Sequence, residues 1–392
     1  MSRNFVASID IGTQFIRVGV AESLIESERP MPKMIGFGLS ESRGLRHGCI
    51  TEKDSVLKCI QKALRLAEKS IGSKIKEVML SVGSTGLGSI SSTAEIVISR
   101  ADLEVSDLDL EKLVTECQNN IPPSASLNRK ILHTIPLSYK LDGKVLIGSP
   151  VGMKGSKLEM KCLFVTVLEK HLNDLIEILE EAGVEVLDAV ANPIASSLVL
   201  LSKQQKRAGC VLINIGGETI SLVVYENNIP ISVEVFPTGG SNITNDIALG
   251  LKISLDEAEH VKLGALTIAN YPRKKVEEII EARLEDIFDH VENHLKKIGR
   301  NGILPAGIIF TGGGSGITDI EVFARQHLKL PAKIGAIPNE NIKHNVVKDS
   351  SWSSIYGLCL LGLGAQGEEE YLKDFVKKTT GKIQKFFKQF LP

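Results

Sequence analysis

The chain has 392 residues, 43% of them hydrophobic and 24% charged, which is the composition of an ordinary globular protein. A single hydrophobic core stops growing beyond roughly 250–300 residues, so this length favours two or more domains. The formal net charge of −1 provides no overall attraction to nucleic acid or to anionic surfaces, and we expect no nucleic-acid partner.

No segment of the sequence has the pattern of a membrane span or a signal peptide. The most apolar stretch, "IYGLCLLGLGA" at Ile355–Ala365, has eleven residues, whereas a spanning helix needs about 20. The N-terminus runs straight into "NFVASIDIG", without a basic stretch followed by an apolar segment. Six scattered cysteines with no close pair argue against a zinc site or a disulfide framework and suit a reducing cytoplasm.

A strand, a tight turn and a second strand are predicted at the start of the chain. "FVASIDIGTQFIRVGVAE" is an apolar strand, then a turn with Asp10, Gly12 and Thr13, then an alternating strand. A turn this tight needs glycine because its backbone approaches closely or adopts a positive φ. A helix is predicted further on, near residues 51–70, from apolar residues at helical spacing: Val56, Ile60, Ala63, Leu64 and Ala67.

The chain changes character between about residues 84 and 160. A polar start, a helix at roughly 106–119, a proline-rich connection at 121–123 and two β-rich runs precede the strand "KCLFVTVL". These residues predict an insertion large enough for a small core of its own. Such an insertion is either a functional interface or a decoration of the surface.

The second half of the chain repeats the opening hairpin. After a predicted helix at 192–205, "GCVLINIGGETISLVVYE" again places a polar residue, Asn214, before Ile-Gly and a threonine, Thr219, after it. Most glycine turns only reverse the chain, but two matching turns can face each other and surround phosphates with backbone N–H groups. The candidate residues of the two turns are Asp10, Gly12, Thr13, Gln14, Asn214, Gly216, Gly217, Glu218 and Thr219.

Two further features follow the second hairpin. In "SLDEAEHVKLGAL", Glu259 and Lys262 are three residues apart and share a helix face; a surface ion pair is the ordinary explanation. "PAGIIFTGGGSGI" is a buried strand that ends at Gly312, Gly313 and Gly314, where a flat ligand can lie against the backbone.

The C-terminal residues form an apolar stripe. After a polar segment that starts at residue 366, five apolar residues fall at i, i+3, i+4, i+7 and i+8: Ile383, Phe386, Phe387, Phe390 and Leu391. A helix this short is marginal in water, so the stripe is buried either on the body of the protein or at a membrane. Lys385 and Lys388 beside phenylalanines favour an interfacial helix that binds anionic lipids.

The two hairpin turns and the third glycine run resemble the phosphate, phosphate and adenosine motifs of the actin, Hsp70 chaperone and sugar kinase superfamily. Two longer stretches further resemble FtsA, the bacterial actin homologue of cell division: "SRGLRHGCITEKDSVLKCIQKALRLAEKSIGSKIKEVMLSVGSTGLGSISSTAEIVIS" and "ILHTIPLSYKLDGK" with the following "IGSPVGMKGSKLEMKCLFVTV". The resemblance extends from Phe5 to Leu391. It implies an α/β, actin-like (ribonuclease H-like) duplicated two-domain fold with an inserted 1C subdomain and a C-terminal amphipathic helix.

The resemblance also implies a division of the chain into subdomains. We expect domain I (1A) at 1–83, 161–195 and 345–365; 1C at 84–160; domain II (2A) at 196–255 and 304–344; 2B at 256–303; a linker at 366–378; and a membrane-targeting helix at 379–392.

By the same resemblance the site binds ATP and Mg²⁺. The two turns then hold the phosphates, the Glu259 and Lys262 pair reaches the ribose and adenine, and the third glycine run holds the adenosine. Asp10 and Asn214 are the residues expected at the metal. The superfamily usually has an aspartate in both turns, and the amide of Asn214 supplies no negative charge.

A second substitution lies in the connecting helix, where some relatives place a glutamate before proline to orient the attacking water. This chain has Asn192-Pro193. Both substitutions favour nucleotide binding over fast turnover, so we expect at most a weak ATPase. Gln14, Glu218 and Asn192 remain unranked candidates for orienting water.

The resemblance implies partners as well. The protein would polymerise through 1C, hold to anionic lipids at the cytoplasmic face of the cell membrane by its tail, and tether FtsZ there, at the division septum, while helping to recruit other division proteins. The tail of FtsZ would dock on 2B, where a charged helical segment covers residues 269–300. The basic residues expected to meet it are Arg283, Lys296, Lys297 and Arg300.

Two other readings stay open. A pilus-assembly adaptor of the same actin-like branch carries a similar insertion but reaches the membrane through partner proteins. A phosphotransferase of the same superfold needs a catalytic aspartate or an acceptor pocket, which nothing in the sequence marks. The basic and aromatic tail favours the membrane-bound division protein over both.

Overall fold

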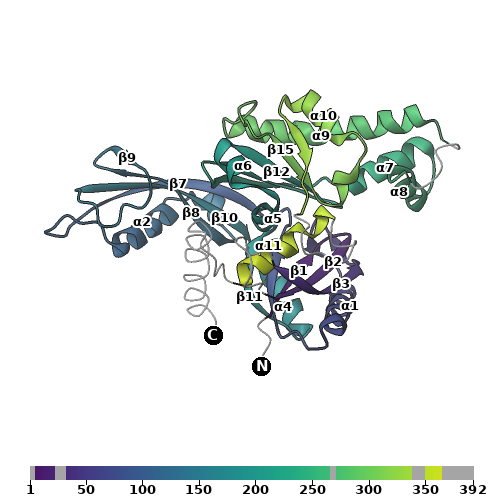
Figure 1. The fold of residues 1–392 in the computed structure, drawn as a ribbon, viewed down its shortest axis with the longest axis horizontal. Helices are drawn as coiled ribbons and strands as arrows, with labels where there is room; N and C mark the ends of the chain where they lie inside the picture. The colour runs from purple at the N-terminus through teal and green to yellow at the C-terminus, as the bar shows by residue number, and fades with distance from the viewer. Residues whose placement is uncertain (1–4, 23–31, 265–270, 338–348, 364–392) are drawn as a thin grey trace.

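The computed structural model describes residues 5–22, 32–264, 271–337 and 349–363. Figure 1 shows two α/β domains stacked on each other and an elongated insertion that extends sideways from their junction. The tail residues 364–392, and with them the seven residues predicted to bind membrane, lie outside the described part of the chain.

Domain I is built on a five-stranded sheet. Its strands in spatial order are β11 (Glu185–Ala191), β6 (Glu77–Val82), β1 (Phe5–Ile11), β2 (Phe15–Glu22) and β3 (Lys33–Glu41). The first three of these run parallel to one another, and β1, β2 and β3 form an antiparallel meander. A two-stranded ribbon, β4 (Leu45–Arg46) and β5 (Cys49–Ile50), follows β3.

Helices cover both faces of this sheet. They are α1 (Lys53–Ile71), α4 (Glu169–Glu181), α5 (Asn192–Leu200) and α11 (Ser353–Gly362), the last preceded by the short helix η4 (Ser350–Trp352). The buried residues of α1 are the five that the sequence predicted from their spacing. The predicted helix at 192–205 is interrupted instead, because Ser202 accepts a hydrogen bond from Gln205 N at 3.2 Å and starts a new helix, α6 (Lys203–Ala208).

Domain II repeats this plan, as the duplicated hairpins predicted. Its sheet has the order β14 (Ile229–Phe236), β13 (Ile220–Glu226), β12 (Cys210–Ile215), β15 (Ile308–Thr311) and β16 (Ala332–Ile334). Again an antiparallel meander is extended by parallel strands. Its helices are α7 (Gly240–Leu251), α8 (Leu255–Lys262), α9 (Arg273–Lys297), η2 (Gly313–Gly316) and α10 (Ile320–Leu328).

The insertion has a four-stranded sheet and its own small core. Its elements are β7 (Gly88–Val97), β10 (Lys157–Leu168), β8 (Arg129–Leu141), β9 (Lys144–Leu146), α2 (Asp107–Asn119) and α3 (Pro123–Ser126). The predicted helix at 106–119 is confirmed, with Ser106 and Asp109 forming a capping box at its start. Strand β10 continues from this sheet into the core of domain I, so no sharp break separates the two, and the residue boundaries predicted for the subdomains stay predictions.

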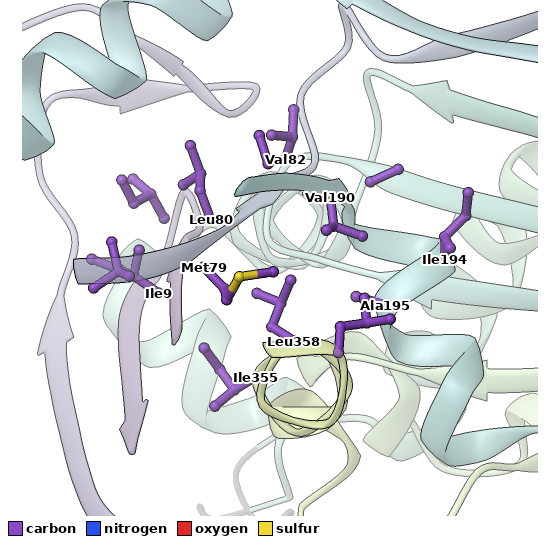
Figure 2. Close-up of a cluster of buried hydrophobic side chains, with 14 of the residues drawn as sticks. Ile9, Met79, Leu80, Val82, Val190, Ile194, Ala195, Ile355 and Leu358 are labelled. Carbon is purple, nitrogen blue, oxygen red and sulfur yellow. The ribbon is translucent and has the colours of Figure 1, made fainter. Parts of the chain in front are cut away.

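Helix α11, the last described helix, packs into the core of domain I. In Figure 2, Ile355 and Leu358 of α11 lie between Ile9 of the sheet and Ala195 of α5. A Cβ atom on Gly357 would collide with the backbone of Ala195, so α5 and α11 approach this closely only because the residue is glycine. Residues 355–361 of the apolar stretch near the C-terminus are therefore part of a buried helix of the core. Within the described ranges, no helix combines the length and the apolar character that crossing a membrane requires.

Candidate functional site

The two glycine turns have the same local geometry. Gly12 N donates a hydrogen bond to Phe15 O at 3.1 Å, and Gly216 N donates to Thr219 O at 2.8 Å. A Cβ atom added to either glycine would lie 2.9 Å from the carbonyl oxygen that its own N–H contacts. Both turns therefore require glycine, and the predicted pair of matching hairpins is confirmed.

The two turns face each other across the junction of the domains. A Cβ atom on Gly217 would lie 3.3 Å from the Cβ atom of Gln14. A cleft of about 320 Å³ opens beside them, lined by Thr13, Gln14, Phe15, Glu41, Ser42, Leu45, Gly217, Glu218 and Ser241. The structure thus brings together four of the predicted residues of the turns and adds a rim from the end of β3 and the start of β4.

Asn192 joins the two turns. Its Nδ2 donates to Asp10 Oδ1 at 3.2 Å and to Ser81 Oγ at 3.0 Å, while its Oδ1 accepts a hydrogen bond from Asn214 Nδ2 at 2.6 Å. Asn192 is 6% exposed and begins α5, the helix that connects the domains. The two polar residues that precede Ile-Gly in the turns are therefore linked through one buried side chain.

The positively charged side chain of Arg17 lies next to the first turn. Arg17 of β2 is the cross-strand partner of Asp10 and donates from its guanidinium to Ser351 Oγ at 3.2 Å. Burial lowers the pKa of Arg17, and the carboxylates of Asp10 and Asp349 partly offset this effect. The positive charge of Arg17 therefore lies within the field of the Asp10 carboxylate.

The turn between β4 and β5 contacts both glycine turns. His47, at a positive φ of 50°, donates from its backbone N to Glu218 Oε2 at 2.6 Å, and its Nδ1 lies 3.1 Å from Glu218 O. Gly48 N donates to Thr13 Oγ1 at 3.2 Å. These two residues were not predicted as site residues; the available signal was Gly48, because glycine marks turns.

The start of α7 completes the second turn. Gly240 N donates to Gly216 O at 2.9 Å, and Ser241 N donates to Gly217 O at 2.7 Å. A Cβ atom on Gly239 would lie 2.6 Å from Gly217 O, so the close approach needs glycine there too. This segment was not predicted as part of the site; the available signal was the glycine pair in "PTGGSN", directly after an apolar strand.

Glu259 and Lys262 form more than a surface ion pair. The Lys262 side chain is only 9% exposed, and its Nζ donates to Glu259 Oε2 at 2.7 Å, to Thr244 Oγ1 at 2.9 Å and to Gly240 O at 3.3 Å. Thr244 Oγ1 in turn donates to Glu259 Oε2 at 2.5 Å. These bonds tie α8 to the start of α7, directly behind the second glycine turn.

The third glycine run packs on the second turn. Gly312 has φ 87°, and a Cβ atom there would collide with Asn214 Oδ1 and lie 2.5 Å from Ile215 O. A Cβ atom on Gly314 would lie 3.2 Å from the same carbonyl oxygen. Gly313 is exposed, and no atom lies within 4 Å of its Cβ position, so its face is open to a ligand.

The basic residues predicted to bind a partner differ in their surroundings. Arg283 of α9 makes a two-pronged ion pair with Asp246 at 2.6 and 3.0 Å, which raises its pKa. Arg300 pairs with Glu226 at 2.8 Å, and Lys296 pairs with Glu292 at 2.9 Å. The ion pairs within the protein say nothing about binding of an acidic peptide. The predicted contacts of all four basic residues, Lys297 included, with such a peptide therefore stay predictions.

Solved structures of other proteins identify the class of this fold. The chain matches one from the PilM-PilN type IV pilus biogenesis complex with a TM-score of 0.67 and 16% identity, over 92% of this chain and 99% of that one. It matches MreB5 of Spiroplasma citri bound to ADP with a TM-score of 0.53 and 14% identity, over 94% and 98%. The fold and its paired turns therefore define an actin-like protein, as predicted.

Sequence comparisons then identify the family. A family model described as "Cell division protein FtsA" matches residues 211–357, and one described as "SHS2 domain inserted in FTSA" matches residues 85–166. FtsA of Bacillus subtilis is 30% identical over 353 residues, which cover 85% of this chain and 78% of that protein. FtsA of Pseudomonas aeruginosa is 26% identical over 388 residues, covering 94% and 91%. The chain belongs to the FtsA family of cell division proteins, which confirms the predicted family.

Proposed function

We propose that this protein is a nucleotide-gated scaffold that polymerises and tethers FtsZ to the cytoplasmic face of the cell membrane at the division septum. The observation that carries the proposal is the pair of matched glycine turns facing each other across the cleft. Turns of this kind offer backbone N–H groups to phosphates. The MreB5 structure of the same fold is described as bound to ADP.

ATP would lie with its phosphates at the two turns. Its adenosine would lie against the open face of Gly313, near the Glu259 and Lys262 pair. The donor set also fits Mg²⁺, because that ion is usually held by one or two carboxylates together with substrate phosphates and waters. Asp10 supplies the carboxylate and Asn214 an amide. Bound Mg²⁺ would neutralise part of the phosphate charge.

Hydrolysis would be slow. Neither Asn192 nor Asn214 can act as a base, and the side chains of both are engaged with each other. Water orientation would therefore depend on Gln14 or Glu218 at the edge of the cleft, or on Asn192 itself. Nucleotide would act mainly by holding the two domains together.

The insertion would supply the contact between protomers. Large apolar side chains on its surface are exposed, and they come from three of its elements: Val97 of β7, Leu108 of α2 and Val145 of β9. Val97 and Val145 lie on the two edge strands of the sheet, so the insertion exposes apolar side chains at both of its edges, where neighbouring protomers could contact it. This supports polymerisation through 1C.

The tail would supply the membrane contact. The apolar stripe from Ile383 to Leu391 and its lysines would form part of an interfacial helix, which would be about 21 Å long over fourteen residues. One such anchor binds weakly, but linking many through a polymer raises the avidity by about a hundredfold or more. FtsZ would bind lobe 2B, where α9 carries Arg283, Lys296 and Lys297, and other division proteins would join this assembly.

Sedimentation with vesicles tests the proposal. With ATP and vesicles that contain phosphatidylglycerol, the full chain should sediment and carry FtsZ with it, and the chain ending at Gly381 should stay in the supernatant. The variant Lys385→Gln/Lys388→Gln separates the lipid charge from the apolar stripe and should bind only partly. Equal sedimentation of the truncated chain would overturn the anchor, and a calorimetric titration without ATP binding would overturn the gating.

The same experiment tests the pilus-assembly reading, which the match to the PilM-PilN complex favours at the level of the fold. An adaptor of that kind reaches the membrane through partners, so the purified chain would not bind vesicles. Sedimentation of the purified full chain would therefore exclude it.

A further inference from the structure

The hydrogen bonds of Asn192 leave no freedom in how its amide is oriented. An ionised carboxylate only accepts hydrogen bonds, so Asp10 must face the nitrogen of the Asn192 amide. The second proton on that nitrogen is directed to Ser81 Oγ at 3.0 Å. The oxygen of the amide then points to the other turn, where it lies 2.6 Å from Asn214 Nδ2.

This orientation fixes the type of side chain that residue 214 must carry. The oxygen of Asn192 needs a donor, and an asparagine amide supplies one, whereas an ionised aspartate has only acceptors. If Asn192 turned its nitrogen toward an acid at 214, its oxygen would face Asp10 instead. Asn192 can therefore satisfy one carboxylate and one amide, but not two carboxylates.

We propose that Asn192 is a positioning residue that ties the two glycine turns together through its side chain, and that residue 214 is an amide because this bridge requires a donor. The bridge is 94% buried at its centre, since Asn192 is 6% exposed. It joins domain I through Asp10, the connecting helix through Asn192 itself, and domain II through Asn214. It holds the turns in register with only one carboxylate, that of Asp10, among its three side chains.

The bridge should reduce the dependence of nucleotide affinity on a divalent cation. This consequence rests on the proposed nucleotide binding. Two carboxylates facing each other repel unless a cation lies between them. The pairing of Asp10 with Asn214 avoids that repulsion, so the turns stay together when divalent cations are removed. Affinity for ADP should therefore depend less on Mg²⁺ in this protein than in its Asn214→Asp variant.

A double-mutant cycle tests the bridge. The four proteins are the wild type, Asn192→Ala, Asn214→Asp and the double variant, each titrated with ADP in excess EDTA and again in Mg²⁺. In EDTA, Asn214→Asp should weaken ADP binding by about tenfold when Asn192 is present. In the Asn192→Ala background the loss should be at least about threefold smaller, as expected for directly coupled residues, because the added carboxylate then no longer faces the oxygen of the Asn192 amide. In Mg²⁺ the loss with Asn192 present should shrink to about threefold or less, because the cation neutralises the added charge.

Asn242→Asp is the matched control, because it makes the same change close to the cleft at a residue outside the bridge. Asn242 Oδ1 accepts from Gly239 N at 2.9 Å, and a carboxylate can accept equally well there. Its effect on ADP binding should be the same with and without Asn192. An equal loss for Asn214→Asp in both backgrounds, as for this control, would overturn the bridge.

The thermal midpoint of the nucleotide-free proteins separates this inference from the proposed function. Asn214→Asp should lower the midpoint in the wild-type background and have a clearly smaller effect in the Asn192→Ala background. If no protein binds ADP or ATP but the midpoints are non-additive, the bridge stands and nucleotide gating is overturned. Additive midpoints together with additive affinities would overturn the bridge and leave the gating intact.

Discussion

Ser89 and Val233 exchange two hydrogen bonds where the insertion meets domain II. Ser89 Oγ donates to Val233 O at 2.9 Å, and Val233 N donates to Ser89 Oγ at 2.7 Å. Ser89 lies at the start of β7, and Val233 lies in β14, the edge strand of the domain II sheet. The insertion enters the chain within domain I, yet one hydroxyl also fixes it to domain II.

Ser89→Ala should loosen this junction. The substitution leaves the Val233 N–H without its partner in a part-buried position, and such a loss costs about 1–3 kcal/mol. Hydrogen exchange of the Val233 amide should accelerate by about tenfold, since 1.4 kcal/mol corresponds to that factor. Ser91→Ala, at an exposed position on the same strand, is the control. Equal exchange rates in the two variants would show that the bonds do not hold the junction.

The third glycine run offers a pair of neighbouring variants that separate folding from binding. Gly312→Ala puts a methyl group against Ile215 O at 2.5 Å and forces alanine to adopt φ 87°, so we expect a loss of stability of at least about 2 kcal/mol. Gly313→Ala meets no atom within 4 Å, and the thermal midpoint should not change. Its methyl group would instead occupy the face offered to the adenosine.

Titration with ADP checks whether the methyl group of Gly313→Ala blocks the adenosine site. Gly313→Ala should weaken binding by about tenfold, which corresponds to 1.4 kcal/mol, while its melting curve matches that of the wild type. Wild-type affinity in this variant would mean that the third glycine run does not hold the base.

The fold could be predicted because its signals are local. Five apolar residues at helical spacing defined α1 and all five are buried, since one face of an amphipathic helix must meet the sheet. The turns at Gly12 and Gly216 could be predicted because no other residue type fits the same approach to a carbonyl oxygen. The helix that was predicted to continue to residue 205 failed for a local reason as well, namely the capping box at Ser202.

The site could be predicted only where it consists of such local turns. His47 contacts Glu218 through its backbone N, 171 residues away in the sequence, and a backbone contact leaves no trace in the residue type. The sequence spacing paired Lys262 only with Glu259 and predicted an exposed ion pair. Two further acceptors of its ammonium group lie on another helix, α7, and their proximity could not be predicted from the sequence. Tertiary packing determines both the contact of His47 and the burial of Lys262, and no periodic pattern in the sequence indicates how these elements pack.

Glu218→Ala should weaken the closure of the cleft. His47 N donates to the Glu218 carboxylate at 2.6 Å, and a hydrogen bond to a charged group is worth about 1.5–3 kcal/mol. Release of bound ADP, followed in a stopped-flow chase, should therefore accelerate by about tenfold or more. Glu41→Ala removes another carboxylate that lines the same cleft without breaking this contact, and serves as the control. The same acceleration in both variants would assign the effect to charge and not to the His47 contact.

Acid should destabilise the protein through its buried histidines. Burial lowers the pKa of His133 to about 3, and that of His171 and of His294 to about 4. The unfolded chain takes up a proton near pH 6.5, and the folded chain does so only at these lower values. Stability from this source is therefore complete above pH 6.5 and is lost as the pH falls toward 4, by up to about 1.4 kcal/mol per pH unit for each histidine.

His133→Gln tests the largest of these contributions. His133 Nε2 accepts from Ala191 N at 3.0 Å, directly before Asn192, so a neutral ring with a bare Nε2 holds the start of α5. Glutamine keeps an acceptor but does not titrate, and between about pH 6.5 and 4 its free energy of unfolding should fall less steeply, by about 1.4 kcal/mol per pH unit. The matched control is His260→Gln at an exposed position. Urea unfolding at several pH values measures the slopes, and a wild-type slope for His133→Gln would contradict the prediction. Because protonation replaces an acceptor by a donor that faces Ala191 N, the same acid should also disturb the residue that joins the two glycine turns.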